Sequence, residues 1–189
     1  IALIFIMFYG GFNTKWKLAR PVAARAVLLS TVGVAITAGV TAILCHFVLR
    51  FSMAESFLIG AVLSSTDAAS VFSILRQKKL NLKDGTASLL EMESGSNDPM
   101  SYMLTVIGIG LVGAGETGNI AWNIFSQLTF GSIVGIVFAI LTILVLTKTN
   151  IVTDGLDTIF MIAAVLFCYA ASEIAGGNQY LSVYFMGII

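Results

Sequence analysis

Between Leu89 and Thr105 the chain reads LLEMESGSNDPMSYMLT, a polar sequence set inside a long apolar segment. Acidic side chains at bilayer depth cost about 2.5–3.5 kcal/mol each on insertion scales, so they usually mark an ion or proton path. Read as a helix, this stretch carries one polar stripe at steps of three and four: Glu91, Ser94, Asp98, Ser101 and Thr105. Glu93 and Asn97 lie one turn apart on a neighbouring face, with Glu93 about 140° from Asp98. Two polar faces predict two separate roles.

The composition of the chain indicates an integral membrane protein with helical spans. Of its 189 residues, 58% are hydrophobic and only 11% are charged, whereas soluble domains average about 45–50% apolar and about 25% charged residues. So few charges would not cover the exterior of a soluble domain with a large apolar core. A barrel is excluded because barrel strands are alternating segments of about 10 residues, and Ala26 to Leu49 is a far longer run without a formal charge.

Long apolar runs predict an all-α fold with about five full transmembrane helices and two truncated ones. A full span needs about 20 predominantly apolar residues. The full spans are 26–49, 56–75, 87–112, 120–147 and 158–175, and the truncated ones are 1–12 and 180–189. We treat 1–189 as a single transmembrane region. Because both ends fall within apolar runs, we expect this region to be a fragment of a larger membrane domain.

The loops between these spans carry unequal positive charge. Lys and Arg number four, one, four, none, one and none in successive loops, so nine of the ten lie in alternate loops. The positive-inside rule places such loops on the cytoplasmic side of the membrane. We therefore predict that loops 13–25, 76–84 and 148–157 are cytoplasmic.

A further acidic residue, Asp67, lies near the middle of the third predicted span. No Lys or Arg falls within any predicted span, so these helices offer no cationic partner to Asp67 or Asp98. The polar run from Ser64 to Ser70 has two readings, because Ser, Thr and Asp favour caps and turns over helix interiors. The helix is either interrupted there, with backbone carbonyls free to face a cation, or continuous, with hydroxyls bonded to preceding carbonyls. The sequence leaves both readings open.

The pair TD at 66–67, followed by ESGSND at 93–98, resembles the paired core-helix motifs of the monovalent cation:proton antiporter family. This family includes the NhaP-type proteins and the Na⁺/H⁺ exchangers. The strings FYGGFN at 8–13 and SSTDAA at 64–69 look most like its bacterial potassium/proton antiporter branch, the cell volume regulation protein A type. The resemblance covers essentially all 189 residues. It implies a NhaA-like antiporter fold, of which this region holds one discontinuous core helix.

The resemblance also implies which residues bind the transported ions. Asp98 would bind the cation and the proton in turn. Thr66 and Ser94 would supply further oxygen ligands to a monovalent cation at Asp98. Asp67 would help through its side chain or through the interrupted backbone around it.

Two residues of the neighbouring face receive different roles from the same resemblance. Asn97 occupies the position where electrogenic relatives have a second Asp, so it would suit an electroneutral exchange of one cation for one proton. Glu93 would be a structural acid paired with an Arg on a later core helix, beyond Ile189. The separate face predicted for Glu93 agrees with that role.

The partners that we expect are those of a membrane transporter. The resemblance implies a multi-pass protein of the bacterial inner membrane, surrounded by lipid, associated with the remaining helices of the same transporter and forming a homodimer. We expect no enzymatic activity, no nucleic-acid partner and no cofactor, because K⁺ or Na⁺ and H⁺ would be the substrates.

These residues support a hypothesis of competition between a cation and a proton at one midplane carboxylate. Burial disfavours the ionised form of Asp98, so it takes up a proton when no cation is bound, and a partly dehydrated cation displaces that proton. One alternative is a passive cation channel, which would conduct without coupling to protons. Another is an intramembrane aspartyl protease with Asp67 and Asp98 as its dyad, although the Gly-x-Gly-Asp and Tyr-Asp signatures of such enzymes are missing from the sequence.

Overall fold

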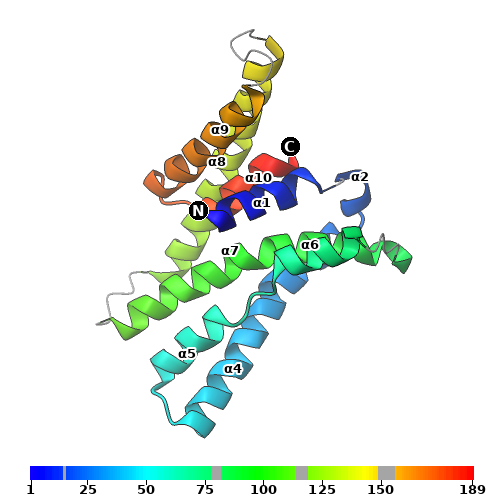
Figure 1. Cartoon of the computed structure of the whole chain (residues 1–189). Helices are drawn as coiled ribbons and strands as arrows, with labels where there is room; N and C mark the ends of the chain where they lie inside the picture. The colour runs from blue at the N-terminus through cyan, green and yellow to red at the C-terminus, as the bar shows by residue number, and fades with distance from the viewer. Residues whose placement is uncertain (15, 78–81, 114–118, 149–155) are drawn as a thin grey trace. The chain divides into compact units, whose positions relative to one another are not determined.

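The computed structural model describes residues 1–14, 16–77, 82–113, 119–148 and 156–189, and all regular structure in these ranges is helical (Figure 1). The α-helices are α1 (Ala2–Phe12), α2 (Trp16–Ala19), α3 (Ala23–Leu28), α4 (Val34–Leu49), α5 (Met53–Val62), α6 (Ala68–Gln77), α7 (Thr86–Val112), α8 (Ile120–Lys148), α9 (Asp157–Ile174) and α10 (Gln179–Ile188). A π-helical segment, η1 (Leu29–Gly33), joins α3 to α4, and a short 3₁₀ turn, η2 (Lys83–Gly85), precedes α7. The predicted all-α fold is confirmed.

Several helices have the length and composition that a membrane span requires. Within the described ranges, three helical stretches are long and apolar enough to cross a bilayer: Ala23–Leu49, Ile120–Lys148 and Asp157–Ile174. Helix α7 has 27 residues, but it carries the polar sequence described above. Helices α1 and α5 are shorter apolar helices. The predicted cytoplasmic loops include residues 15, 78–81 and 149–155, which lie outside the described residues.

The third predicted span, 56–75, is interrupted. Helix α5 ends at Val62 and α6 begins at Ala68, and the residues between them form a turn and an extended link. Of the two readings that the sequence left open for the polar run 64–70, the structure therefore has the interrupted one.

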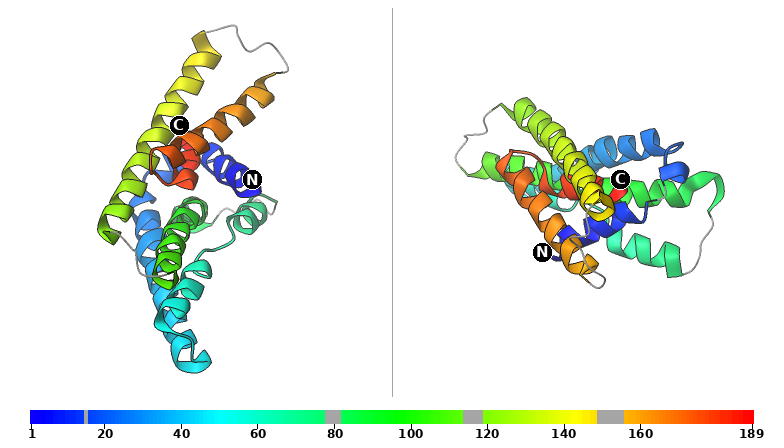
Figure 2. Two further views of the ribbon diagram at one scale, coloured as in Figure 1. Left: turned by 90° about the vertical axis from the view of Figure 1, so that its left-hand side faces the viewer. Right: turned by 90° about the horizontal axis from the view of Figure 1, so that it is seen from above.

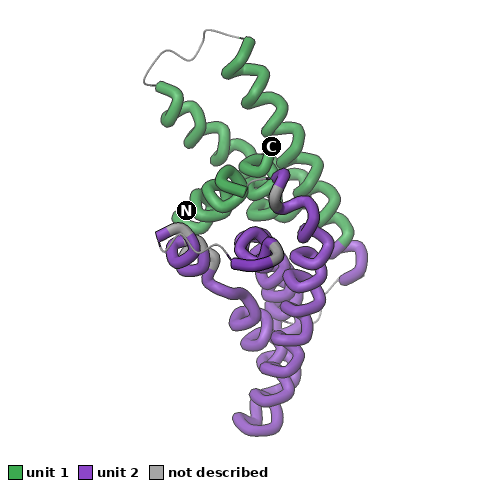
Figure 3. Tube along the Cα trace, turned by 90° about the vertical axis from the view of Figure 1, so that its right-hand side faces the viewer, with its two compact units in different colours: residues 1–14, 125–189 green, residues 15–124 purple. Residues whose placement is uncertain are grey.

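The helices form two compact units, shown in different colours in Figure 3. Unit 1 comprises residues 1–14 and 125–189, and unit 2 comprises residues 15–124. The two units are defined by contacts within the protein. That 1–189 forms a single transmembrane region stays a prediction.

Unit 1 is built around close contact between α1 and α10. Its core consists of Ile4, Met7, Ala139, Val165, Cys168, Val183, Tyr184 and Met186. A Cβ atom on Gly11 would lie 2.3 Å from the carbonyl oxygen of Tyr184, and one on Gly187 would lie 2.4 Å from that of Phe8. The two backbones therefore approach to a distance that only glycine permits, as small residues allow in helix pairs within membranes.

Unit 2 contains the polar sequence and its surroundings. Helices α4 and α5 lie side by side, and α5 also packs on α7 (Figures 1 and 2). The turn between α4 and α5 begins at Arg50, whose φ of 62° places it in the left-handed region. Helix α5 then starts with a capping box, in which Ser52 and Glu55 bond each other's backbone N–H groups. Helix α5, which packs on α7, therefore has a well-defined start.

Gly60 fixes the distance between α4 and α5. A Cβ atom on Gly60 would lie 2.2 Å from the carbonyl oxygen of Ala38, whereas one on Gly39 would meet nothing within 4 Å. We expect Gly60→Ala to destabilise the protein by about 1–3 kcal/mol, because overpacking forces the two helices apart. Gly39→Ala is the matched control and should leave the melting temperature unchanged or slightly higher, since alanine is the better helix former. Equal melting temperatures of the two variants in detergent would contradict this account of the α4–α5 contact.

Candidate functional site

The interruption between α5 and α6 exposes helix ends that need hydrogen-bond partners. The last carbonyls of any helix lack partners within it. Here the carbonyl oxygen of Ala61 accepts hydrogen bonds from the hydroxyls of Ser64 and Ser101, both at 2.7 Å. One donor comes from the interruption itself and the other from α7. The end of α5 is therefore completed by polar side chains at a buried position.

At the other side of the interruption, Asp67 caps α6. Its carboxylate oxygens accept hydrogen bonds from the backbone N–H of Ser70 at 3.2 Å and from the Ser70 hydroxyl at 2.5 Å. This is the usual position and bonding of an N-cap carboxylate. The structure therefore places the Asp67 side chain at the start of α6, and its role as a direct cation ligand stays a prediction.

The polar stripe of α7 faces the interruption. Ser101 bonds the carbonyl of Ala61, as described above. Asp98 Oδ1 accepts a hydrogen bond from the hydroxyl of Ser65, and the hydroxyls of Ser94 and Thr66 lie 2.9 Å apart. Three members of the stripe thus contact residues 61–66 in antiparallel order, one after another along α7.

Asn97 joins the two predicted faces of α7. Its side-chain Nδ2 donates to the hydroxyl oxygen of Thr66 and, at 3.3 Å, to a carboxylate oxygen of Glu93. Asn97 is fully buried, yet its side-chain oxygen Oδ1 has no hydrogen-bond partner among the described residues. A buried acceptor without a donor costs about 1–3 kcal/mol. This oxygen is therefore available to a ligand.

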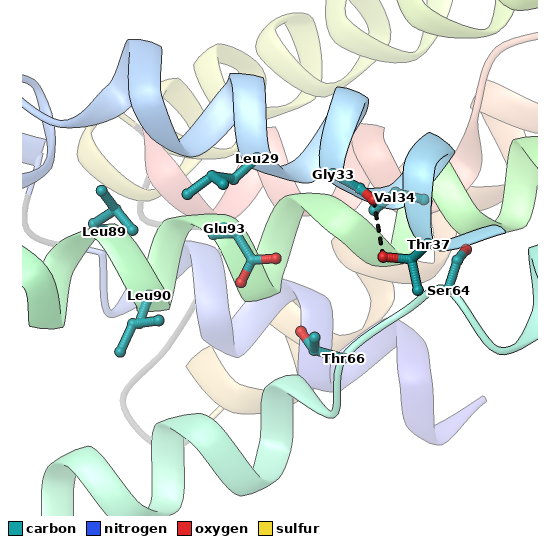
Figure 4. A pocket seen from close by; sticks show the side chains of 9 residues that line it. All are labelled: Leu29, Gly33, Val34, Thr37, Ser64, Thr66, Leu89, Leu90 and Glu93. Atoms are coloured by element: carbon teal, nitrogen blue, oxygen red, sulfur yellow. Dashed lines mark hydrogen bonds between the residues drawn. The ribbon is translucent and has the colours of Figure 1, made fainter. Parts of the chain in front are cut away.

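An open pocket of about 190 Å³ borders this network (Figure 4). It is lined by Leu29, Gly33, Val34, Thr37, Ser64, Thr66, Leu89, Leu90 and Glu93. Figure 4 shows Leu29 and Thr37 on the ribbon that carries η1 and α4, and Glu93 on α7 beside them. The pocket has room for a few water molecules. Thr66 and Glu93 therefore both border this open space.

The charges around Asp98 are negative. Asp67 and Glu93 lie close enough to act on Asp98 through their charge. Within the described parts of the chain Asp98 forms no ion pair with Lys or Arg, and its hydrogen-bond partner is Ser65. An arrangement of several carboxylates with amide and hydroxyl oxygens favours the binding of a cation or of protons.

The structure gathers most of the predicted site residues. Thr66, Ser94 and Asn97 lie in one hydrogen-bonded cluster, and Glu93 touches it through Asn97, its neighbour on the second predicted face. Asp98 is linked to this cluster through Ser65, whose hydroxyl bonds both the Asp98 carboxylate and the Thr66 carbonyl. Asp67 adjoins it in the chain but bonds Ser70. Sequence reasoning missed Ser65, although it stands in the polar run 64–70, for which an interrupted helix was one of the two readings.

Comparison with known proteins identifies the family. The model of the sodium/hydrogen exchanger transmembrane family matches residues 1–189. The chain belongs to this family. The resemblance noted in the sequence is thereby confirmed, and this exchanger-family chain is part of a multi-pass membrane protein.

Relatives of this exchanger-family chain include curated antiporters and a solved structure. The K(+)/H(+) antiporter NhaP of Alkalimonas amylolytica is 36% identical over 191 residues, covering 99% of this chain and 33% of the relative. The K(+)/H(+) antiporter NhaP2 of Shewanella oneidensis is 35% identical over 191 residues, with the same two coverages. The chain therefore spans about a third of the length of these curated relatives.

A solved structure supports the fold. The sodium proton antiporter MjNhaP1 from Methanocaldococcus jannaschii, at pH 8, superposes with a TM-score of 0.79 at 24% identity, covering 98% of this chain and 46% of that one. The predicted antiporter fold is confirmed by this likeness.

The contact between Ser101 and Ala61 gives a test of how α7 supports the interruption. We expect Ser101→Ala to lower the free energy of unfolding by about 0.5–1.5 kcal/mol, the net value of a typical buried hydrogen bond. Ser132→Ala is the control, because the Ser132 hydroxyl bonds the Leu128 carbonyl of its own helix. Thermal unfolding in detergent measures both variants. Equal stability of Ser101→Ala and Ser132→Ala would show that α7 does not support the end of α5.

Proposed function

We propose that the full-length protein is a secondary active antiporter that exchanges a monovalent cation for protons across the membrane. Membership of the sodium/hydrogen exchanger family supports this proposal. The relatives of 35–36% identity are named K(+)/H(+) antiporters, so K⁺ is the first candidate for the cation and Na⁺ the second.

The observation that carries the proposal is the surrounding of Asp98. This half-buried carboxylate forms no ion pair with Lys or Arg in the described part of the chain. Ser65 links it to Thr66, and Thr66, Ser94 and Asn97 form one hydrogen-bonded cluster. Monovalent cations in transport proteins are held by carboxylate, hydroxyl and carbonyl oxygens that replace their hydration shell. The unpartnered oxygen of Asn97 supplies one acceptor of this kind.

Coupling follows from competition at Asp98. A carboxylate that is removed from water binds a proton readily, and a cation held by Asp98, Ser94 and Thr66 would displace that proton. Either ligand neutralises the site. The site with a proton or a cation bound therefore moves between the two sides of the membrane at a lower free-energy cost than the empty, ionised site. Exchange then requires no other energy source.

Asp67 and Glu93 have supporting roles in this proposal. Asp67 holds the start of α6 and adds negative charge near Asp98, which favours a cation in the site. Glu93 anchors the amide of Asn97 at the edge of the open pocket. Its pairing with an Arg from a later core helix, as the resemblance implies, is part of the proposal for the whole transporter.

The setting of the full-length protein is also a proposal. The curated relatives are about three times as long as the matched region, so further helices of the same transporter would surround the site. We propose a homodimer in the bacterial inner membrane, with loops 13–25, 76–84 and 148–157 in the cytoplasm, as the charge distribution indicates.

Replacement of Asp98 tests the central carboxylate. In the full-length protein reconstituted into vesicles, Asp98→Asn should reduce cation-dependent proton flux to the level of protein-free vesicles, because the amide can neither release a proton nor carry the charge that holds a cation. K⁺, Na⁺ and Li⁺ are compared side by side. Asp157→Asn, an exposed acid at the start of α9, is the control and should retain wild-type flux.

Two results would contradict the proposed function. Exchange by Asp98→Asn at the wild-type rate would remove the carboxylate from the mechanism. Cation conductance without any coupled proton movement in the wild-type protein would instead indicate a channel.

Two threonines of the open pocket allow a test of the cation ligands. Thr66 bonds Ser94 and Asn97, whereas the Thr37 hydroxyl bonds the Gly33 carbonyl of its own helical stretch. We expect Thr66→Val to raise the KM for the cation about tenfold, the effect of losing one polar ligand from a part-buried cluster. Thr37→Val should change this KM by less than about twofold, because it removes no bond to the cluster. Equal KM values for the two variants would exclude Thr66 from the cation site.

A further inference from the structure

Residues 16–25 carry a group of exposed cations that the proposed mechanism does not use. Lys17, Arg20 and Arg25 are exposed, and the side chain of Trp16 beside them is 50% exposed. The first 54 residues contain no Asp or Glu, and within the described ranges none of these three cations forms an ion pair. The segment therefore presents positive charge to its surroundings.

Small apolar residues hold this segment against the rest of unit 2. Ala19 and Ala26 are buried and pack with Met92 of α7. Val22 is also buried, and a Cβ atom on Gly85 would lie 3.4 Å from Val22 Cγ1, so η2 lies against it. Helices α2 and α3 both contact α7. The exposed cations are therefore carried by a backbone that is packed on the helix of the candidate site.

The segment lies at the start of a candidate membrane span. The span Ala23–Leu49 begins within it, and loop 13–25 is cytoplasmic in the setting proposed above. Anionic lipids of the cytoplasmic leaflet attract Lys and Arg that lie next to a span. Trp is enriched at the level of the headgroups, where its ring meets apolar chains and its N–H meets polar groups. Exposed cations beside an exposed Trp at the end of a span therefore fit the headgroup region of an anionic membrane.

We propose that residues 16–25 form a docking surface for the headgroups of anionic phospholipids. Arg20 N donates to the carbonyl oxygen of Trp16 at 2.8 Å, so this turn is helical and Lys17 and Arg20 are neighbours on its surface. These two cations would bind the lipid phosphate, with the guanidinium donating two hydrogen bonds in a fork. The Trp16 ring would lie against the adjoining part of the acyl chains.

The docking surface is more than the charge bias that orients the chain. The positive-inside rule counts the cations of a loop and applies whatever structure the loop has. Here the cations lie on a packed segment and are free of ion pairs in the described structure. This inference rests on the proposed cytoplasmic placement of loop 13–25, and it is independent of the exchange at Asp98.

Fluorescence quenching by brominated lipids tests the surface, because the region has two tryptophans in contrasting settings. Trp16 lies among the cations, whereas Trp122 follows a link, 113–119, that has Glu116 and no Lys or Arg. Full-length proteins that keep one of the two, with every other Trp changed to Phe, are reconstituted with brominated phosphatidylglycerol or brominated phosphatidylcholine. At low salt, the preference for phosphatidylglycerol should be on the order of a hundredfold at Trp16, since each of three cations adds about fivefold. At Trp122 it should be less than about twofold.

Charge variants show whether the cations cause this preference. Lys17→Gln combined with Arg20→Gln should lower the preference at Trp16 to about fivefold, the share of Arg25. Lys17→Arg combined with Arg20→Lys keeps both charges and should keep the preference. Arg50→Gln is the matched control, because Arg50 is an exposed cation of the loop after α4. In about 1 M salt the wild-type preference should disappear, since charges are then screened beyond about 3 Å.

Each remaining outcome would overturn the docking surface. Equal quenching of Trp16 by the two lipids would show that anionic headgroups do not gather there. An unchanged preference in the double Gln variant would show that Lys17 and Arg20 do not bind them. If that variant is too unstable to reconstitute, Lys17→Gln and Arg20→Gln are measured singly, with a loss of about fivefold expected from each. Displacement of the lipid by excess glycerol phosphate would indicate a site for soluble phosphate instead.

The assay also separates this inference from the proposed function. Quenching measures no transport, so failure of the docking surface leaves the proposed antiporter as it stands. Exchange by Asp98→Asn at the wild-type rate would contradict the proposed function and leave the docking surface unaffected.

Discussion

A helix that is interrupted inside a membrane must find partners for its polar groups within the protein, because the lipid offers none. The link between α5 and α6 meets this requirement through α7. The Ala61 carbonyl, the Ser65 hydroxyl and the Thr66 hydroxyl each meet a polar side chain of α7 at successive levels. The polar stripe of α7 and the link between α5 and α6 therefore satisfy each other's hydrogen bonds. If one of them were apolar or helical, polar groups of the other would lack partners.

The same requirement for hydrogen-bond partners explains why polar side chains gather around the link between α5 and α6. Side chains that complete the helix ends are oxygen-rich, and they stand beside a carboxylate that forms no ion pair with Lys or Arg in the described ranges. The side chains that complete the helix ends therefore lie next to those of the proposed ion site. Asn97 belongs to the proposed site, since its Nδ2 bonds Thr66 while its Oδ1 has no partner in the described structure.

The apolar runs were enough to predict the long helices. The span predicted at 120–147 is observed as Ile120–Lys148, and the one predicted at 158–175 as Asp157–Ile174. In contrast, the link predicted at 50–55 holds the first turn of α5, because the capping box of Ser52 and Glu55 starts the helix at Met53. That signal was present in the sequence. The π-helical segment η1, with the sequence LSTVG, lies inside the predicted span 26–49 and was not predicted.

Those site residues whose positions follow from helical spacing could be predicted from the sequence. Those whose positions depend on tertiary contacts could not. Spacing alone placed Ser94, Asp98 and Ser101 on one face of α7. The sequence could not decide whether the polar run 64–70 is helical, because that depends on whether α7 offers partners to an open helix end. For the same reason the direction of Ser65 could not be foreseen, nor that Asn97, which shares the second face with Glu93, would bond Thr66.

The antiparallel match between α7 and residues 61–66 has a consequence for how such a chain can diverge. A single inserted or deleted residue between Ser94 and Ser101 would turn the rest of the helix by about 100° and move it about 1.5 Å along its axis. All the hydrogen bonds between α7 and residues 61–66 beyond that point would then be lost together. This portion of α7 can therefore tolerate substitutions, but it does not tolerate insertions or deletions.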